Sequence, residues 1–232
     1  MRGGSHYLGY ATSPDGLHWT RWPGNPLTSR GWVEDMMVVK QAGTYYMFAE
    51  GPENTTAHLL TSKDRLHWQE QGDLDIRYVN GKPLRKGNYG TPVAWFEDKV
   101  WNLFYENGDA AVWLARSRDA KVWTNVQDEP VLRPGPAAYD PKLIAMDQVI
   151  KCRGRYYGYY HGLGPHGWNS CVAMSEDLVH WKKYPRNPIV DGGDRTSPIV
   201  VHDGRQYRLY TMHPEVRVYF PRSGTGQPPA TE

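Results

Sequence analysis

The sequence predicts an all-β protein of one fold class, a β-propeller of four-stranded antiparallel blades. Two interleaved repeats and the lack of any capped stretch with a 3.6-residue period support this prediction. The phrase Ser-x-Asp-x-x-x-Trp begins at residues 13, 62, 117 and 175, so neighbouring copies start 49, 55 and 58 residues apart. Regular units of this size are typical of propeller blades, whereas a β-sandwich needs no near-identical units.

The Ser-x-Asp-x-x-x-Trp phrase predicts a strand, a tight turn and a second strand. Each copy follows a short apolar or aromatic run, namely "HYLGYAT", "AHLLT", "AVWLAR" and "CVAM". Ser and Asp side chains can satisfy the amides of a turn, and the Trp opens the next strand. Three copies have a proline seven residues after the Trp, at Pro26, Pro130 and Pro188. We interpret the phrase as architecture rather than chemistry.

A second repeat lies between the copies of the first and predicts the other two strands of each blade. Every copy has an apolar strand, a polar turn of about four residues and an aromatic strand. The four copies cover residues 34–51, 90–107, 146–162 and 196–212. Two strands from each repeat together make one four-stranded unit.

The two ends of the sequence predict incomplete blades. The chain opens with the third and fourth strands of one blade and closes with the first three strands of another. The ends could join in one shared blade, giving four, or belong to separate blades of a truncated five-bladed protein. We expect a single domain over residues 1–222, and a mobile tail over 223–232, where the residues offer little to pack.

Composition excludes several classes of partner. The net charge of +2 has no long run of either sign, so we expect neither nucleic acid nor a membrane surface as a partner. No apolar stretch approaches the ~20 residues that span a bilayer. The start of the chain shows no signal peptide, and the compartment stays open. Cys152 and Cys171 form no metal motif, and a disulfide between them is not expected.

The phrase "SEDLVHW" followed by "RNPIV", and an acidic residue opening a strand before "GRYYGYYHG", resemble the five-bladed propeller glycosidases. These are glycoside hydrolase families 43, 32, 68, 117 and 130, and the resemblance covers nearly the whole chain without selecting one family. It implies a five-bladed propeller with three acidic residues in a central funnel. The Arg-Asp-Pro opening of family 43 is absent, with "VEDMMV" in its place. The Glu-Gly-Pro triplet of "AEGPEN" ends a second strand rather than starting a first.

Alignment of the second repeat places the candidate site residues in two registers. The first register, at the start of the innermost strands, contains Asp35, Thr91, Asp147 and Ser197. The second, fourteen or fifteen residues later, contains Glu50, Glu106, His161 and Met212. The first two strands of a blade are antiparallel, so both registers should reach the same rim of the channel.

Converging carboxylates are the groups that glycoside hydrolysis needs, because one donates a proton and the other activates water or attacks the sugar. We predict Asp35 as base or nucleophile, Asp147 as a second acidic residue that orients substrate or adjusts pKa, and Glu106 or Glu50 as acid. In the alternative interpretation, the aspartates cap amides at strand starts and the glutamates are solvated. The variant Asp35→Asn is expected to abolish turnover with little loss of folding.

Further residues are candidates for substrate binding. Trp32 and Trp168 could stack on a sugar ring, and Arg195 could bind a carboxylate or phosphate unless it pairs with Asp194. No cofactor is expected, although His161 or His166 could hold a sugar hydroxyl or a central divalent cation; loop histidines are the alternative. The complete set of substrate-binding candidates is Trp32, Thr91, His161, Trp168, Arg195 and Ser197.

The leading functional prediction is a carbohydrate-active enzyme that hydrolyses glycosidic bonds in an oligosaccharide or glycoside. A glycoside phosphorylase is a variant of that prediction. The alternatives are a non-catalytic propeller that binds glycans or protein partners with the same funnel, which a missing half-blade would favour, and a structural propeller without a ligand. The sequence predicts neither the sugar, the linkage nor the oligomeric state.

Overall fold

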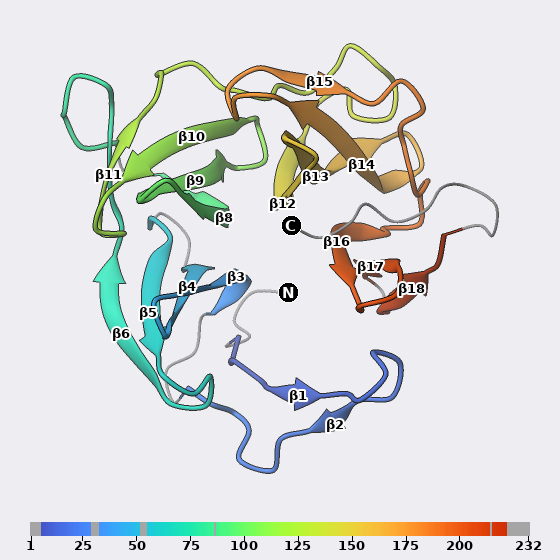
Figure 1. The fold of residues 1–232 in the computed structure, drawn as a ribbon. Helices are drawn as coiled ribbons and strands as arrows, with labels where there is room; N and C mark the ends of the chain where they lie inside the picture. Colours follow the sequence, from blue (N-terminus) through green and yellow to red (C-terminus); the bar gives the residue numbers. More distant parts are fainter. Residues whose placement is uncertain (1–5, 29–32, 52–54, 86, 214, 222–232) are drawn as a thin grey trace. The chain divides into compact units, whose positions relative to one another are not determined.

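A computed structural model of the chain describes residues 6–28, 33–51, 55–85, 87–213 and 215–221. Regular structure in these ranges is entirely β-strand (Figure 1). The predicted mobile tail over 223–232 lies outside the described residues. The chain forms two compact units: residues 1–108 with 114–128, and residues 109–113 with 129–232. Whether residues 1–222 act as one domain stays a prediction.

The first unit begins with a two-stranded ribbon and continues into two antiparallel sheets. The ribbon pairs β1 (Ala11–Thr12) with β2 (Thr20–Arg21). The next sheet has the order β3 (Glu34–Gln41), β4 (Thr44–Glu50), β5 (His58–Ser62) and β6 (Trp68–Asp73). The following sheet has the order β8 (Tyr89–Glu97), β9 (Val100–Asn107), β10 (Val112–Ser117) and β11 (Val122–Asn125). A short strand, β7 (Asp75–Arg77), extends it in parallel with β11.

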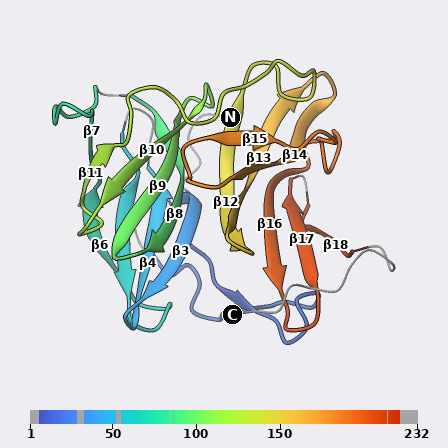
Figure 2. The same cartoon turned by 45° about the horizontal axis from the view of Figure 1, so that its top comes forward.

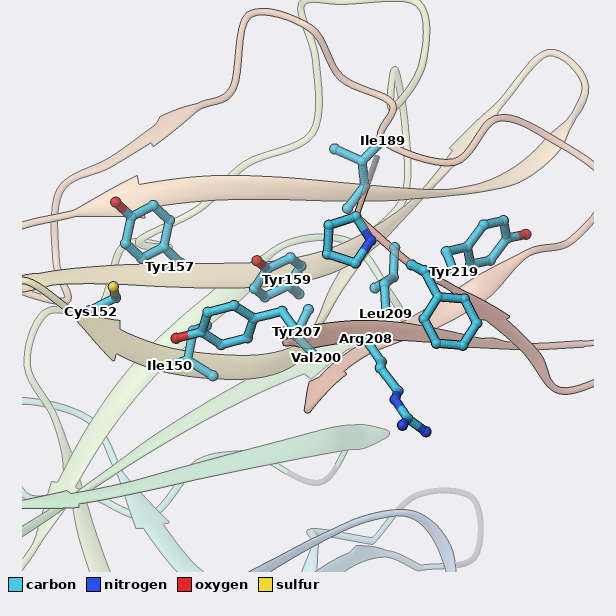
Figure 3. A pocket seen from close by; sticks show the side chains of 12 residues that line it. Ile150, Cys152, Tyr157, Tyr159, Ile189, Val200, Tyr207, Arg208, Leu209 and Tyr219 are labelled. Atoms are coloured by element: carbon cyan, nitrogen blue, oxygen red, sulfur yellow. The ribbon is translucent and has the colours of Figure 1, made fainter. Parts of the chain in front are cut away.

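The second unit contains two sheets that lie side by side (Figure 2). One has the order β12 (Ile144–Cys152), β13 (Arg155–Gly164), β14 (Gly167–Ser175) and β15 (Trp181–Lys183). The other has three strands, β16 (Thr196–His202), β17 (Tyr207–Met212) and β18 (Arg217–Tyr219). The Gln148 side chain joins the sheets, because it donates to the Val200 carbonyl at 3.0 Å and accepts from the Val200 amide at 2.7 Å. A cavity also lies between them (Figure 3).

The predicted fold class is confirmed. Apart from the added strand β7, each of the four larger sheets follows the chain order from one edge to the other, as the blades of a β-propeller do. The four predicted hairpins are the pairs β3–β4, β8–β9, β12–β13 and β16–β17. Among the described residues, the last blade has three strands and the first ribbon has two, which agrees with the expectation of incomplete terminal blades.

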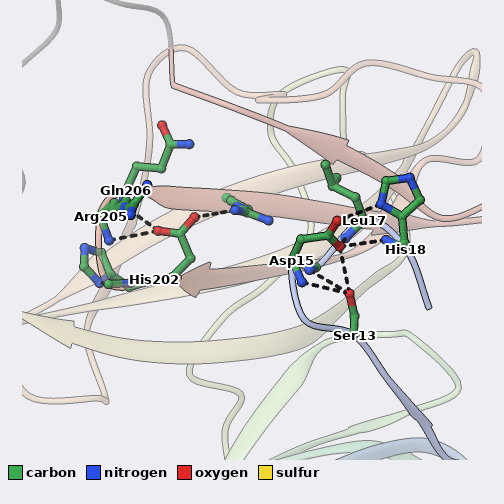
Figure 4. Close-up of polar contacts among 11 residues, drawn as sticks. Ser13, Asp15, Leu17, His18, His202, Arg205 and Gln206 are labelled. Carbon is green, nitrogen blue, oxygen red and sulfur yellow. Dashed lines mark hydrogen bonds and ion pairs between the residues drawn. The ribbon is translucent and has the colours of Figure 1, made fainter. Parts of the chain in front are cut away.

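The hairpin turns are shorter than the sequence predicted. Three of them have only two residues between the strands, and both residues have positive φ, at Ala42–Gly43, Asp98–Lys99 and Arg153–Gly154. Such turns match the right-handed twist of the paired strands. The other polar residues that were predicted to form the turns therefore belong to the ends of the strands. The β16–β17 turn has the predicted four residues, and Asp203 accepts hydrogen bonds there from the amides of Arg205 and Gln206 (Figure 4).

Aromatic side chains fill the core between the two sheets of the first unit. Phe48 is fully buried, with its ring 5.6 Å from Trp101 and 5.8 Å from Trp123, in edge-to-face geometry. Aromatic pairs in this arrangement contribute more than their buried area alone. Much of the unusual aromatic content is therefore sheet packing.

The Ser-x-Asp-x-x-x-Trp turn is held by its own side chains. Ser13 Oγ accepts hydrogen bonds from the amides of Asp15 at 3.3 Å and Gly16 at 2.8 Å. Asp15 Oδ1 accepts from the amides of Leu17 and His18, both at 2.8 Å (Figure 4). The same four bonds recur in the copies that start at Ser62, Ser117 and Ser175. The interpretation of the phrase as architecture is confirmed.

The fourth position of every copy has a left-handed backbone. Its φ is 74° at Gly16, 71° at Arg65, 62° at Ala120 and 69° at Leu178. Only glycine adopts this conformation without strain, so the hydrogen bonds from Ser and Asp must hold the other three copies in place. The turn tolerates varied residues because its side-chain bonds impose the geometry.

Removing the aspartate of one turn should destabilise the protein. In Asp119→Ala, the amides of Lys121 and Val122 lose their acceptor, and we expect the free energy of unfolding to fall by about 1 kcal/mol, as for the loss of a helix cap. Urea unfolding measures the change. The control is Lys121→Ala, which alters the same turn but keeps both acceptors. Equal stability of the two variants would contradict this account of the turn.

The turn aspartates should also contribute to acid unfolding. Hydrogen bonds from the His67 side chain and from the amides of His67 and Leu66 hold the pKa of Asp64 well below its ordinary value of 3.8. A depressed folded-state pKa gives stability that is complete above the unfolded value and lost as pH falls below it. We therefore expect Asp64→Asn to have a shallower fall in Tm than the parent as pH drops below 3.8. Parallel Tm curves for the two proteins would contradict this expectation.

Candidate functional site

The first strand of each blade contains a β-bulge at the predicted first register. Strand pairing is interrupted between Glu34 and Met37, and at the corresponding places in the other three sheets. The residues within the interruptions include Asp35, Thr91, Asp147 and Ser197. A bulge adds a residue to one strand and changes the direction of its side chain, and bulges are frequent beside active sites.

Three bulge residues have a left-handed backbone. The φ angle is 40° at Asp35, 43° at Thr91 and 50° at Ser197. A β-branched residue such as threonine is strained in this region. Strain that recurs at one position in several blades supports a functional hypothesis for that position.

The second register lies beside the first in every blade. Strand pairing joins Glu34 with Glu50, Gly90 with Glu106, Ala145 with His161 and Thr196 with Met212. Both registers therefore reach the same end of each sheet, as the antiparallel pairing predicted. Strand pairing brings the two registers together within each sheet separately.

Two carboxylates of the first unit meet at Gly90. A Cβ atom added to Gly90 would lie 2.2 Å from Glu50 Oε2 and 2.6 Å from Glu106 Oε1. The two oxygens are thus both close to one point, although Glu50 belongs to β4 and Glu106 to β9 of the neighbouring sheet. Any side chain larger than hydrogen at position 90 would separate them.

The two carboxylates have different surroundings. Glu106 is 3% exposed, whereas Glu50 is partly buried. The Thr91 amide donates a hydrogen bond to Glu50 Oε2 at 3.2 Å. Burial favours the neutral form of a carboxyl group, and an amide donor favours the ionised form. The two carboxyl groups therefore differ in both burial and hydrogen bonding.

Asp35 is an exposed carboxylate at the same sheet end. Its side chain is exposed, and the strand pair next to it joins Glu34 with Glu50. Glu34 is engaged with His6, whose Nδ1 lies 2.7 Å from Glu34 Oε2. Of the two neighbouring acids on β3, Asp35 is the one that lies within the bulge and has a left-handed backbone.

In the second unit, Asp147 and His161 form a buried pair. His161 Nδ1 lies 2.9 Å from Asp147 Oδ1 and 3.1 Å from Oδ2, and the side chains are 12% and 4% exposed for His161 and Asp147. The Trp168 ring meets the His161 ring edge to face at 5.0 Å. The three predicted residues are thus brought together, with the carboxylate fixing the orientation of the imidazole.

The other predicted binding residues have varied positions. Asp194 Oδ1 accepts from the Trp168 amide at 3.3 Å, and the ion pairs among the described residues do not include one between Asp194 and Arg195. Ser197 Oγ lies 3.4 Å from Thr196 Oγ1. His166 is exposed on the β13–β14 turn, and Trp32 lies outside the described residues.

Both cysteines are free thiols, and the described residues include neither a metal-binding group nor a membrane-spanning helix. Cys152 and Cys171 are both free thiols, as expected, and burial raises the pKa of Cys171 to about 12. In the part of the chain that the structure describes, no group of three or more His, Cys, Asp or Glu side chains is placed to hold a metal ion. That same part contains no helix of the length and apolarity that crossing a membrane requires.

Gly90 was not among the residues predicted from the sequence. Its signal was present, because a glycine directly preceded Thr91 in the first register, where the other blades have Glu34, Met146 and Thr196. Gln148, which follows Asp147 and joins the two sheets of its unit, had no comparable signal.

The β-propeller that these blades define is also the fold of known glycoside hydrolases and phosphorylases. A glycosyl hydrolase from Bacteroides ovatus matches with a TM-score of 0.71 and 19% identity, over 97% of this chain and 76% of that chain. The β-1,2-mannobiose phosphorylase from Listeria innocua, solved with β-1,2-mannobiose, matches with a TM-score of 0.71 and 17% identity, over 91% of this chain and 65% of its own.

A third similar structure comes from a study of glycoside hydrolase family 130. That family is described as mannoside phosphorylases that include hydrolases targeting β-1,2-mannosidic linkages in Candida mannan. The match has a TM-score of 0.72 and 19% identity, over 96% of this chain and 77% of that chain. No family model and no curated protein matches the sequence. At these identities the likeness establishes the fold.

Adding a methyl group at Gly90 should disturb the carboxylate pair. Because the new Cβ of Gly90→Ala would lie within 2.6 Å of both glutamates, we expect the free energy of unfolding to fall by about 1–3 kcal/mol. Gly9→Ala is the control, since its nearest neighbour, Asn25 Nδ2, is 3.9 Å away. Chemical unfolding compares the variants. Unchanged stability in Gly90→Ala would mean that the glutamates do not meet there.

Proposed function

We propose that the protein is a carbohydrate-active enzyme that cleaves glycosidic bonds. The observation that carries this proposal is the meeting of Glu50 and Glu106 at Gly90, beside the strained register of Asp35 and Thr91. Glycoside cleavage needs one carboxyl group that holds a proton and another that is ionised. The fold that the chain shares with glycoside hydrolases and phosphorylases supports the same reaction class.

Within this proposal, Glu106 is the acid that protonates the leaving oxygen. Its burial and the closeness of Glu50 both favour a retained proton near neutral pH. In these roles Glu50, which accepts a hydrogen bond from the Thr91 amide, is the ionised partner of Glu106. Asp35 is exposed and belongs to the first register, beside these glutamates, and it acts as the base or nucleophile.

Asp147 acts in this proposal on substrate position rather than on proton transfer. Its carboxylate is occupied by His161, and Trp168 packs against that histidine. The fixed imidazole and the indole then offer a hydrogen-bonding group and a ring face to a sugar. Arg195 is a candidate for binding phosphate, and this role separates a phosphorylase from a hydrolase.

The first experiment is cleavage of a panel of aryl glycosides, including mannosides, arabinosides, xylosides and galactosides, with and without phosphate. We expect turnover of at least one substrate and its loss in Asp35→Asn. A rate that requires phosphate, and falls in Arg195→Ala, would identify a phosphorylase. A folded protein that binds a glycan but turns over none of the panel would instead support a non-catalytic propeller.

The acid can be identified from the leaving group. In Glu106→Gln, we expect cleavage of a glycoside with a poorly acidic leaving alcohol to fall by about 10²–10⁴-fold, because that alcohol needs a proton. A nitrophenyl glycoside should lose much less, since nitrophenolate leaves without one. Glu97→Gln is the matched control, because Glu97 lies at the end of β8 opposite to Gly90, the residue that pairs with Glu106. Equal losses for both leaving groups would remove Glu106 from this role and shift the test to Glu50→Gln.

A further inference from the structure

The cavity between the two sheets of the second unit has a volume of about 410 Å³ (Figure 3). It lies beyond Gln148, toward the end of β12 that contains Ile150 and Cys152, whereas Asp147 lies nearer the start of that strand. It is therefore distinct from the register of the proposed active site. The volume falls within the range of small-molecule sites in proteins.

Rings and branched aliphatic side chains line this cavity from both sheets. Tyr157 and Tyr159 come from β13, and Tyr207 comes from β17. In the other sheet, Val200 on β16 pairs with Leu209 on β17, and Leu209 pairs with Tyr219 on β18. These three residues form one row across that sheet. Figure 3 shows the tyrosine rings directed into the space between the strands. Flat aromatic walls of this kind favour a flat apolar ligand.

The cavity is electrically neutral. Arg208 is the one cationic side chain among the described residues that line it. This side chain is paired with Asp203, with Nη2 2.6 Å from Oδ2, and its guanidinium lies over the Phe220 ring. Burial raises the pKa of Tyr159 to about 12 and raises that of Tyr207 as well. The phenols of Tyr159 and Tyr207 therefore stay uncharged at neutral pH. A charged ligand would lose hydration without gaining a partner.

The lining also disfavours a sugar. No carboxylate or amide side chain is among the described residues that line the cavity, so its polar side-chain groups are essentially phenols, one thiol and the paired guanidinium. A sugar seated against these rings would find few hydrogen-bond partners in the lining, and each hydroxyl group that lost its water there would cost about 1–3 kcal/mol. An aromatic ring with one hydroxyl group has no such deficit.

We propose that this cavity is a binding site for a neutral, planar aromatic molecule of one or two rings, such as a phenol or naphthol. Its rings would lie against the tyrosines, and its hydroxyl group would meet a tyrosine hydroxyl. This site does not depend on the proposed glycoside cleavage.

The test measures binding of 2-naphthol to the full chain by calorimetry and by protection of a thiol. Cys152 lines the cavity and is partly accessible, whereas Cys171 is buried, so a maleimide should label Cys152 alone. We expect saturable binding of 2-naphthol, slower labelling of Cys152 when it is bound, and at least about tenfold weaker binding of naphthalene-2-sulfonate.

Substitutions that fill the cavity locate the site. Val200→Trp should weaken 2-naphthol binding by at least about tenfold, and Val201→Trp, an exposed neighbour on the same strand, by less than about twofold. Leu209→Trp fills the cavity from the other strand, and the melting transition of each variant reports folding. No saturable binding by the parent, or equal loss in the folded Val200 and Val201 variants, would overturn the proposal. So would a methyl mannoside that protects Cys152 better than 2-naphthol.

Discussion

In each blade, the first strand has an extra residue near one end, beside the end of its antiparallel partner. Because of this bulge, the residues of the first register are turned out of the regular pleat, and in three blades they accept a left-handed backbone. The second register is brought alongside by ordinary pairing, such as Gly90 with Glu106. The meeting of the two glutamates at Gly90 depends on this arrangement, and so does the proposed chemistry.

The repeated turns and the candidate site differ in how their side chains vary between blades. The Ser-x-Asp turns repeat the same hydrogen bonds in four copies and tolerate Gly16, Arg65, Ala120 or Leu178 at the strained position. The first register keeps a bulge in all four blades and a left-handed backbone in three of them, but its side chains change. A feature that every blade needs is therefore constant in the sequence, and a feature that only a site needs varies between blades.

Much of this could be predicted from the sequence, because strand pairing is a matter of counting residues. A spacing of sixteen, with a bulge and a tight turn between, is enough to place Glu50 beside Glu34 and Glu106 beside Gly90. The contact of Glu50 with Gly90 could not be predicted, since it joins neighbouring sheets and depends on side-chain direction. The Asp147–His161 pair was missed for a similar reason: the two residues were assigned separate roles, although a bulge turns one toward the other.

The partner of each buried carboxylate decides what it can do. Asp147 lies against the His161 imidazole, and an imidazole N–H directed at a carboxylate favours the ionised form of that group. Glu106 is buried to a similar degree but has another carboxylate as its neighbour, and the repulsion between two charges is relieved when one of them is protonated. In the proposed function, two acids of nearly equal exposure have opposite tasks, one as a fixed negative charge and the other as a proton donor. The difference arises from His161, which the strand register places near Asp147, and from Glu50, which reaches Gly90 from the neighbouring sheet.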